Sequence, residues 1–119
     1  MDEINALDPA AIERLRKLGG DKFAGEMVDL FLSYGGKKVT EALAAWQAGN
    51  LAGVAEAAHA LKSSAGNVGA ELVRKLAAQA EQSAKNTLND AVAADVTALE
   101  QAFTEVRPLL EAAKARIQK

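Results

Sequence analysis

Apolar residues recur along this chain at the alternating three- and four-residue intervals that are typical of amphipathic helices. The most regular stripe runs from Val92 to Ile117, and a second one runs from Leu51 to Val68. Each stripe is much longer than an ordinary strand, so both predict helices that bury one face against their neighbours.

The first part of the chain predicts a short helix followed by a long one. Asp8 is a typical N-cap, Pro9 suits the first helical position, and Gly19–Gly20 ends the short helix. The long helix is expected from about 21 to 48, with a bend at Gly35–Gly36 because two adjacent glycines weaken a helix. Its apolar positions are Phe23, Met27, Leu30, Phe31, Tyr34, Val39, Leu43 and Trp46.

Two further helices are expected before the last one. Asn50 caps the first of them, which ends near 67–69 where turn residues return. The next is expected to end around 86–89 and to turn three of its residues inward: Leu72, Leu76 and Ala80. The last helix is expected over about 90–118, and Pro108 should kink it locally without ending it, because this proline lies off the apolar stripe.

Four long amphipathic helices joined by short turns predict an all-α fold, an antiparallel up-and-down four-helix bundle with a short N-terminal capping helix. The 119 residues suit a single domain that spans 1–119. A bundle of this size can bury its apolar stripes within itself, so we expect a monomer.

Composition narrows the classes of function. Half of the residues are apolar, which excludes intrinsic disorder, and the net charge of -2 lacks the positive field that nucleic acid binding needs. No cysteine is present, so disulfides and cysteine-based zinc sites are excluded.

No run approaches the roughly 20 apolar residues of a membrane helix, and the acidic start at Asp2-Glu3 is unlike a signal peptide. We therefore expect a cytoplasmic protein without membrane contact.

The chain has a single histidine, His59, in the middle of the second stripe. A helical wheel places it roughly 130° from the centre of that stripe, so its imidazole should reach water. Three small residues share its side of the helix and leave a strip that a second protein could approach closely: Ala55, Ser63 and Gly66. Lys62, about one turn further along, lies within side-chain reach.

A lone histidine is most often an ordinary core or surface residue. Here an exposed imidazole is expected beside an ammonium group, with no carboxylate and hydroxyl partners that would complete a catalytic triad. This arrangement favours transient covalent capture of an anionic group over acid–base catalysis, because unprotonated imidazole is a good nucleophile near neutral pH and the cation offsets the incoming charge. A phosphoryl group is the natural candidate.

The residues around this histidine carry a resemblance to a known family. The run from Ala58 to Ala70 reads AHALKSSAGNVGA. It resembles the His-x-Leu-Lys-Gly-Ser-x-x-x-x-Gly-Ala signature of histidine phosphotransfer (Hpt) domains of phosphorelays. Further matches to the layout of the family extend over nearly the whole chain: Leu7-Asp8-Pro9, Leu18-Gly19-Gly20, Phe31-Leu32 and Gly49-Asn50-Leu51. The resemblance implies the same bundle that the periodicity predicts.

The resemblance also implies roles for three residues. His59 is then the phosphoacceptor, which takes the phosphoryl group on Nε2 from the aspartyl-phosphate of a receiver domain and passes it to the aspartate of another receiver. Lys62 helps to neutralise the phosphoryl oxygens. The family commonly places a Gln or Glu 22 positions after the histidine, which is Glu81 here, where it accepts a hydrogen bond from Nδ1. The alternative for Glu81 is a solvated surface carboxylate.

One position departs from the family pattern. Ser63 stands where the family usually has glycine, one turn from the histidine and facing the incoming partner. We expect the small hydroxymethyl group to be tolerated. The candidate residues for receiver docking are Ala55, Glu56, Ser63 and Gly66.

The partners implied are response-regulator receiver domains, a hybrid sensor histidine kinase, or both. No nucleotide-binding motif is present, so the chain is expected to be a carrier and not an enzyme, without a cofactor of its own; magnesium would arrive with the receiver. No metal site is expected either, because the acidic residues of the last helix are spaced as a solvated face: Glu100, Glu105 and Glu111. Two other functions stay open at this point, namely a passive helical interaction module and the phosphoacceptor domain of a chemotaxis-type histidine kinase.

Overall fold

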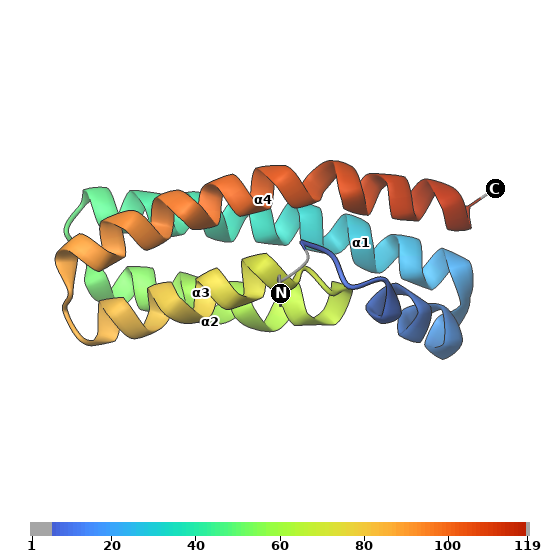
Figure 1. The fold of residues 1–119 in the computed structure, drawn as a ribbon, viewed down its shortest axis with the longest axis horizontal. Helices are drawn as coiled ribbons and strands as arrows, with labels where there is room; N and C mark the ends of the chain where they lie inside the picture. The colour runs from blue at the N-terminus through green and yellow to red at the C-terminus, as the bar shows by residue number, and fades with distance from the viewer. Residues whose placement is uncertain (1–5, 119) are drawn as a thin grey trace, which may run out of the picture.

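The computed structural model describes residues 6–118, which form an antiparallel up-and-down bundle of four helices (Figure 1). Each helix packs against its two neighbours around the bundle, so that α1 lies between α2 and α4, and α3 closes the ring. The molecule measures 45 × 32 × 21 Å. The predicted fold class is therefore confirmed. The four helices are α1 (Pro9–Gln47), α2 (Leu51–Val68), α3 (Glu71–Lys85) and α4 (Asn89–Ile117).

The short and long helices expected at the start of the chain form one element, α1, which is interrupted at Gly20. This glycine has φ 91° and ψ 178°, outside the helical region, and it lets the chain turn between the two parts. The first part begins at the predicted cap, where Oδ1 of Asp8 accepts a hydrogen bond of 3.0 Å from the backbone N–H of Ala10. It buries Ile12 and Leu15 at one end of the bundle, as a capping segment should (Figure 1).

Gly69 connects this capping segment to the turn between α2 and α3. It ends α2 in the left-handed conformation, with φ 76°, and its carbonyl accepts a 2.8 Å hydrogen bond from the backbone N–H of Asp8. A Cβ atom at this position would lie 2.6 Å from the Asp8 carbonyl oxygen and 2.7 Å from Cβ of Ala11. Both the backbone angle and the close approach therefore require glycine here.

Gly35 and Gly36 do not break α1. Inside this helix only Gly20 leaves the helical dihedral region, so the glycine pair does not interrupt the helix, and the bend predicted there stays a prediction. Gly35 is buried, and a Cβ atom there would lie 2.9 Å from Cε1 of Phe103 on α4. The missing side chain makes room for that ring, whose centroid lies 5.5 Å from that of Phe31.

The buried face of α3 is rotated relative to the predicted one. Leu72 and Leu76 are half-buried at its flanks, and only Ala80 of the predicted inward set is fully buried. The small residues along the buried face let α3 approach α2 and α4 closely. The buried residues of α3 are Val73, Ala77, Ala80, Glu81 and Ala84.

The last helix behaves as its periodicity predicts. α4 continues through the exposed Pro108 to Ile117, and its stripe is buried from Val92 to Ala113. Between residues 6 and 118, no helix combines the length and the apolar character needed to cross a membrane.

Candidate functional site

His59 lies on the outer face of α2, near the middle of the helix. Asn50 fixes the start of this helix, since its Oδ1 accepts a 2.9 Å hydrogen bond from the backbone N–H of Gly53. The neighbouring Ala58 and Leu61 are completely buried, whereas the side chain of His59 is 62% exposed. The imidazole reaches solvent, as the helical wheel predicts.

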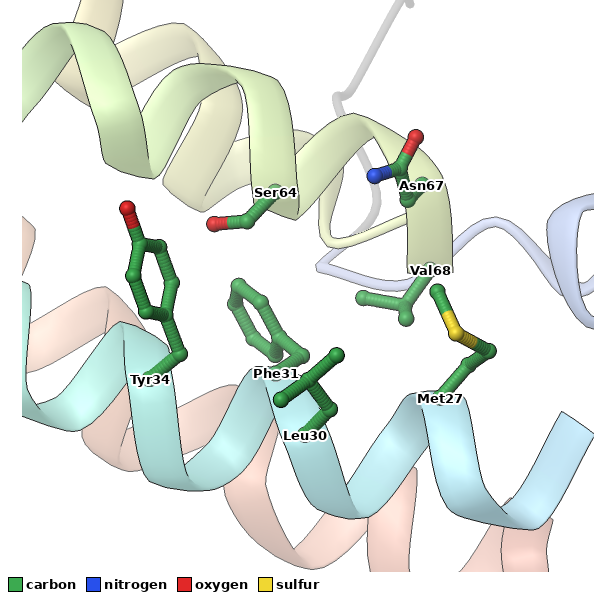
Figure 2. A pocket seen from close by; sticks show the side chains of 7 residues that line it. All are labelled: Met27, Leu30, Phe31, Tyr34, Ser64, Asn67 and Val68. Carbon is green, nitrogen blue, oxygen red and sulfur yellow. The ribbon is translucent and has the colours of Figure 1, made fainter.

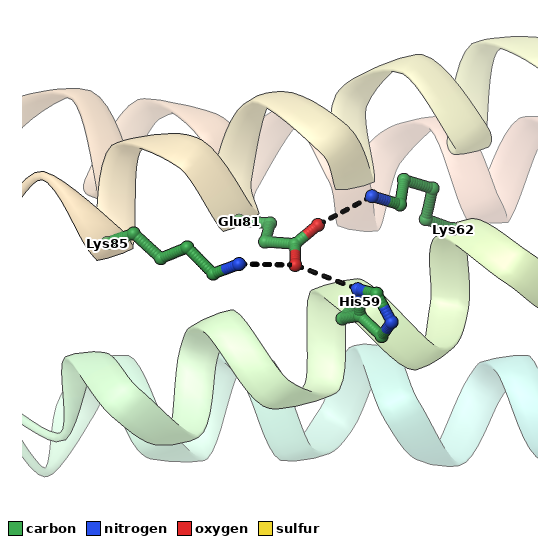
Figure 3. Close-up of polar contacts among 4 residues, drawn as sticks. All are labelled: His59, Lys62, Glu81 and Lys85. Atoms are coloured by element: carbon green, nitrogen blue, oxygen red, sulfur yellow. Dashed lines mark hydrogen bonds and ion pairs between the residues drawn. The ribbon is translucent and has the colours of Figure 1, made fainter.

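Glu81 reaches this imidazole from α3 (Figure 3). Its Oε2 lies 2.8 Å from Nδ1 of His59, although the two residues are 22 positions apart. An ionised carboxylate can only accept a hydrogen bond, so Nδ1 carries the hydrogen, and in the neutral ring Nε2 is then the nitrogen that keeps its lone pair. The contact therefore selects the tautomer in which the unprotonated nitrogen is the one remote from Glu81.

Two lysines hold the same carboxylate. Nζ of Lys62 lies 2.8 Å from Oε1 of Glu81, and Nζ of Lys85 lies 3.1 Å from Oε2. The hydrogen bond from Lys62 lowers the pKa of Glu81 to about 2, and the hydrogen bonds from Lys85 and His59 act in the same direction, while burial opposes them. Glu81 is only 6% exposed, so the alternative of a solvated surface carboxylate is wrong.

Sequence reasoning missed Lys85. Its signal was present, because a lysine four residues after a glutamate on a helix is placed to form an ion pair with it. The position of Lys62 also differs from the simple expectation of a cation beside the histidine. Its ammonium group is bound to Oε1 of Glu81, the carboxylate oxygen that does not face Nδ1 of His59 (Figure 3).

A shallow hollow of about 310 Å³ lies beside the imidazole. Of the predicted docking residues, Glu56 is exposed at this hollow, while Ala55 is 9% exposed and packs into the core with Val54 and Val92. Ala55 therefore offers little surface to a partner. The hollow is lined by Ala55, Glu56, His59, Glu81 and Lys85.

The two other predicted docking residues have small side chains, so little protrudes from the helix surface on the C-terminal side of His59. Ser63 is exposed and Gly66 is half-buried. A Cβ atom on Gly66 would lie 3.5 Å from Cδ of Arg74, which is an ordinary contact. The packing of the bundle therefore does not require glycine at position 66.

An apolar groove of about 220 Å³ lies between α1 and α2 (Figure 2). Leu30 and Tyr34, which belong to the apolar stripe of α1, are 58% and 40% exposed there instead of buried. Sequence reasoning did not predict the groove. Its lining consists of Met27, Leu30, Phe31, Tyr34, Ser64, Asn67 and Val68.

Within residues 6–118, no three His, Cys, Asp or Glu side chains come together in a way that could hold a metal ion. The arrangement around His59 is instead that of an oriented nucleophile. The lone pair of the imidazole is on Nε2, remote from Glu81. The buried carboxylate of Glu81 contacts Nδ1 and binds the two lysine ammonium groups.

Comparisons with known proteins agree with this geometry. The family model described as Hpt domain matches residues 26–115. Histidine-containing phosphotransfer protein B (HptB) from Pseudomonas aeruginosa PAO1 has a similar structure, with a TM-score of 0.88 and 24% sequence identity over 96% of this chain and 98% of that chain. A rice protein described as a candidate histidine-containing phosphotransfer protein gives a TM-score of 0.81 and 22% identity over 97% of this chain and 86% of that chain. No curated protein matches the sequence.

Proposed function

Because the chain belongs to the Hpt domain family, whose members carry phosphoryl groups in phosphorelays, we propose that His59 accepts a phosphoryl group from the aspartyl-phosphate of a receiver domain and passes it to the aspartate of another receiver. The observation that carries this proposal is the hydrogen bond between Nδ1 of His59 and the buried Glu81. It orients an exposed imidazole with its nucleophilic nitrogen toward solvent.

The transfer needs no proton to move. The lone pair of Nε2 forms a bond to phosphorus, the bond between phosphorus and the aspartyl oxygen breaks, and its electron pair leaves with the carboxylate of the receiver. The hydrogen on Nδ1 stays in place. The phosphorylated ring then carries a positive charge, which lies 2.8 Å from an anionic oxygen of Glu81.

Glu81 is suited to stabilise that ring. Its pKa of about 2 keeps the carboxylate ionised at neutral pH in spite of its burial, with Lys62 as the main cause. A charged acceptor also makes a stronger hydrogen bond than a neutral one. The same contact therefore supports orientation before transfer and charge compensation after it.

The surface around His59 suits docking of a receiver domain. On one side of the histidine lies the hollow with Glu56, and on the other lie the small residues Ser63 and Gly66. The apolar groove with Leu30 lies between α1 and α2, the helix that carries His59 (Figure 2). We assign the groove to the receiver because Ser64, which lines it, directly follows Ser63 on the helix that carries His59, and because exposed apolar side chains of this size are typical of partner contacts.

The same proposal covers partners and cofactors. The donors and acceptors are receiver domains, including that of a hybrid sensor histidine kinase, and the magnesium ion of the reaction belongs to the receiver. The chain itself acts as a carrier and does not use ATP, in keeping with the absence of a nucleotide-binding motif from its sequence. The cytoplasmic location and the monomeric state stay predictions.

The test is transfer of radioactive phosphate from a phosphorylated receiver. We expect acid-labile, base-stable label on the chain, and no label on a His59→Gln variant that keeps the same helical circular dichroism. Absence of label with every cognate receiver would support a passive interaction module instead. Label that appears only with ATP and the ATP-binding domain of a chemotaxis-type kinase would support the third function.

A further inference from the structure

The hydroxyl group of Ser63 forms no hydrogen bond with any group of residues 6–118, although this serine lies inside α2. A hydroxyl inside a helix can bond to the backbone carbonyl three or four residues earlier. For Ser63 that carbonyl would be the one of Ala60 or His59. Four other helical hydroxyls of this protein are bonded in this way, namely those of Thr40, Ser64, Thr97 and Thr104.

Ser63 lies on the side of His59 to which Nε2 points. Nδ1 is turned to Glu81, and Figure 3 shows the other ring nitrogen directed toward the end of α2 at which Lys62 lies. Ser63 directly follows Lys62 and stands four positions after His59, so its Cβ lies about 5–6 Å from that of the histidine on the same helix face. Helical side chains lean toward the N-terminus of their helix, so the side chain of Ser63 leans back toward the imidazole.

A phosphoryl group on Nε2 would bring three acceptor oxygens to this side of the ring. The side chain of His59 is 62% exposed and Ser63 is exposed as well, so nothing has to move before the two groups meet. The hydroxyl is a donor that the fold itself does not use, and it stands where the new acceptors arrive.

We propose that the hydroxyl of Ser63 donates a hydrogen bond to a phosphoryl oxygen on His59 and thereby slows the loss of the phosphoryl group to water, an inference that rests on the proposed function. Ser63 thereby contacts the transferred group itself. The serine that replaces the usual glycine of the family pattern then stabilises the phosphorylated state, which is more than a tolerated substitution.

The effect on lifetime follows from how the phosphoryl group leaves. In hydrolysis the bond between Nε2 and phosphorus breaks and its electron pair returns to Nε2. Water forms the new bond to phosphorus, and both of its hydrogens leave with inorganic phosphate. The transition state is loose, so the phosphoryl oxygens carry less negative charge in it than in the dianion. A hydrogen bond to these oxygens is therefore stronger before the bond breaks, and it slows the reaction.

The same reasoning separates the lifetime from the rate of phosphorylation. During transfer from a receiver, the hydrogen bond reaches its full strength only after the bond to Nε2 has formed, so it adds little to the transition state. Ser63 should therefore prolong the phosphorylated state and leave the rate at which a receiver phosphorylates His59 nearly unchanged.

The test uses phosphoramidate, a small donor that phosphorylates the exposed histidine without any receiver. Nε2 attacks phosphorus, the bond between phosphorus and the protonated nitrogen of the donor breaks, and ammonia leaves. The remaining donor is then removed. The decay of the phosphohistidine signal at neutral pH and the pH titration of the phosphoryl group are followed by ³¹P NMR.

We expect Ser63→Ala to shorten the half-life of the phosphohistidine roughly threefold, the effect of one hydrogen bond at a solvent-exposed site. Ser63→Gly should shorten it by the same factor, because the hydrogen bond depends on the hydroxyl and not on the bulk of the side chain. The midpoint of the phosphoryl titration should rise in both variants, since the hydrogen bond favours the dianion. Ser33→Ala, which removes an exposed serine of α1, should change neither quantity.

Two results would overturn the inference: a wild-type half-life in Ser63→Ala, whatever Ser63→Gly does, or an equal shortening in Ser33→Ala. Failure of the proposed function looks different. In that case phosphoramidate labels His59 but no phosphorylated receiver does, and the half-lives still decide the role of Ser63. Absence of label at His59 with phosphoramidate as well would contradict both proposals.

Discussion

Oε2 of Glu81 lies 2.8 Å from Nδ1 of His59, across the contact between α3 and α2. This single contact joins a 6% exposed anion to a largely exposed ring, and it decides which nitrogen of the neutral ring keeps its lone pair. The site therefore has a buried half, Glu81, and a solvent-facing half, His59, and each can be altered separately by mutation.

Replacement of Glu81 should slow phosphorylation of His59. Glu81→Ala removes the acceptor of the Nδ1 hydrogen, and we expect the rate of label transfer from a phosphorylated receiver to fall about tenfold, as for loss of an orienting partner of a functional histidine. Glu81→Gln keeps an acceptor oxygen without the charge, so its rate of label transfer should lie between those of Glu81→Ala and the wild type. An unchanged rate in Glu81→Ala would remove this residue from the mechanism.

Glu81 should also make the stability of the fold depend on pH in acid. Its pKa is lowered from 4.5 to about 2, so its contribution is fully present above 4.5 and is lost as the pH falls toward 2. Because Lys85 and His59 are largely exposed, screening by solvent limits that contribution to roughly 1–2 kcal/mol.

The measurement is the free energy of unfolding by urea for the wild type and for Glu81→Gln, at several pH values in the acid range. The difference between the two proteins should shrink as the pH is lowered through this window. A difference that stays constant would show that the charge of Glu81 adds nothing to stability.

Ser63 should be neutral for transfer. Its side chain is exposed and lies one turn from His59, so a receiver that accommodates glycine at this position meets only one extra hydroxymethyl group. We expect the rate of transfer from a receiver to change less than about twofold in Ser63→Gly, while the fold loses roughly 0.5 kcal/mol through the lower helix propensity of glycine. A variant that transfers many-fold faster would reveal crowding by the native serine.

The groove between α1 and α2 should contribute to receiver affinity and not to the chemistry at His59. Leu30→Asp places a charge on its exposed apolar wall, and we expect the dissociation constant for a receiver to rise about tenfold, the effect of losing one useful apolar contact. Labelling by phosphoramidate should not change.

Leu109→Asp is the matched control for this variant. Leu109 is a leucine of α4 that is 44% exposed, compared with 58% for Leu30, and it does not line the groove. Its replacement should leave receiver affinity unchanged. Equal losses of affinity in the two variants would argue against the groove as the docking surface.

Gly35 and Gly36 should respond oppositely to alanine. The new Cβ at Gly35 would lie 2.9 Å from Cε1 of Phe103, so overpacking outweighs the gain in helix propensity and we expect a net loss of about 1 kcal/mol. At Gly36 the nearest ring atom is at 3.6 Å, an ordinary contact, and alanine should add about 0.5–1 kcal/mol. Urea unfolding of both variants measures the difference. Stabilisation in Gly35→Ala would show that the ring of Phe103 has room to shift.

Local sequence was sufficient to predict the helices and most of their ends. The caps at Asp8 and Asn50 and the left-handed turn at Gly69 act over three or four residues, so their signals are complete within the stretch of chain that forms them. The same holds for the exposure of His59, because the apolar stripe of its own helix already determines which side faces water.

The position of Glu81 needed more than local sequence. The resemblance to the Hpt family pointed to this residue, but its burial depends on how far α3 is rotated about its axis. That rotation is set by packing against two other helices, and it buries Val73 and Ala77 where the sequence pattern favoured Leu72 and Leu76. The pairing of Lys85 with Glu81 could have been predicted from their spacing, but its relation to His59 could not.

The sequence by itself therefore determined four amphipathic helices, their caps and an imidazole that faces solvent, because each of these depends on neighbours a few residues away. Only the tertiary structure decided that one carboxylate meets the histidine and two lysines, and that Leu30 and Tyr34 line an open groove instead of the core. Contacts between helices depend on the rotation and spacing of whole elements, which are properties of the packed bundle and not of any one stretch of chain.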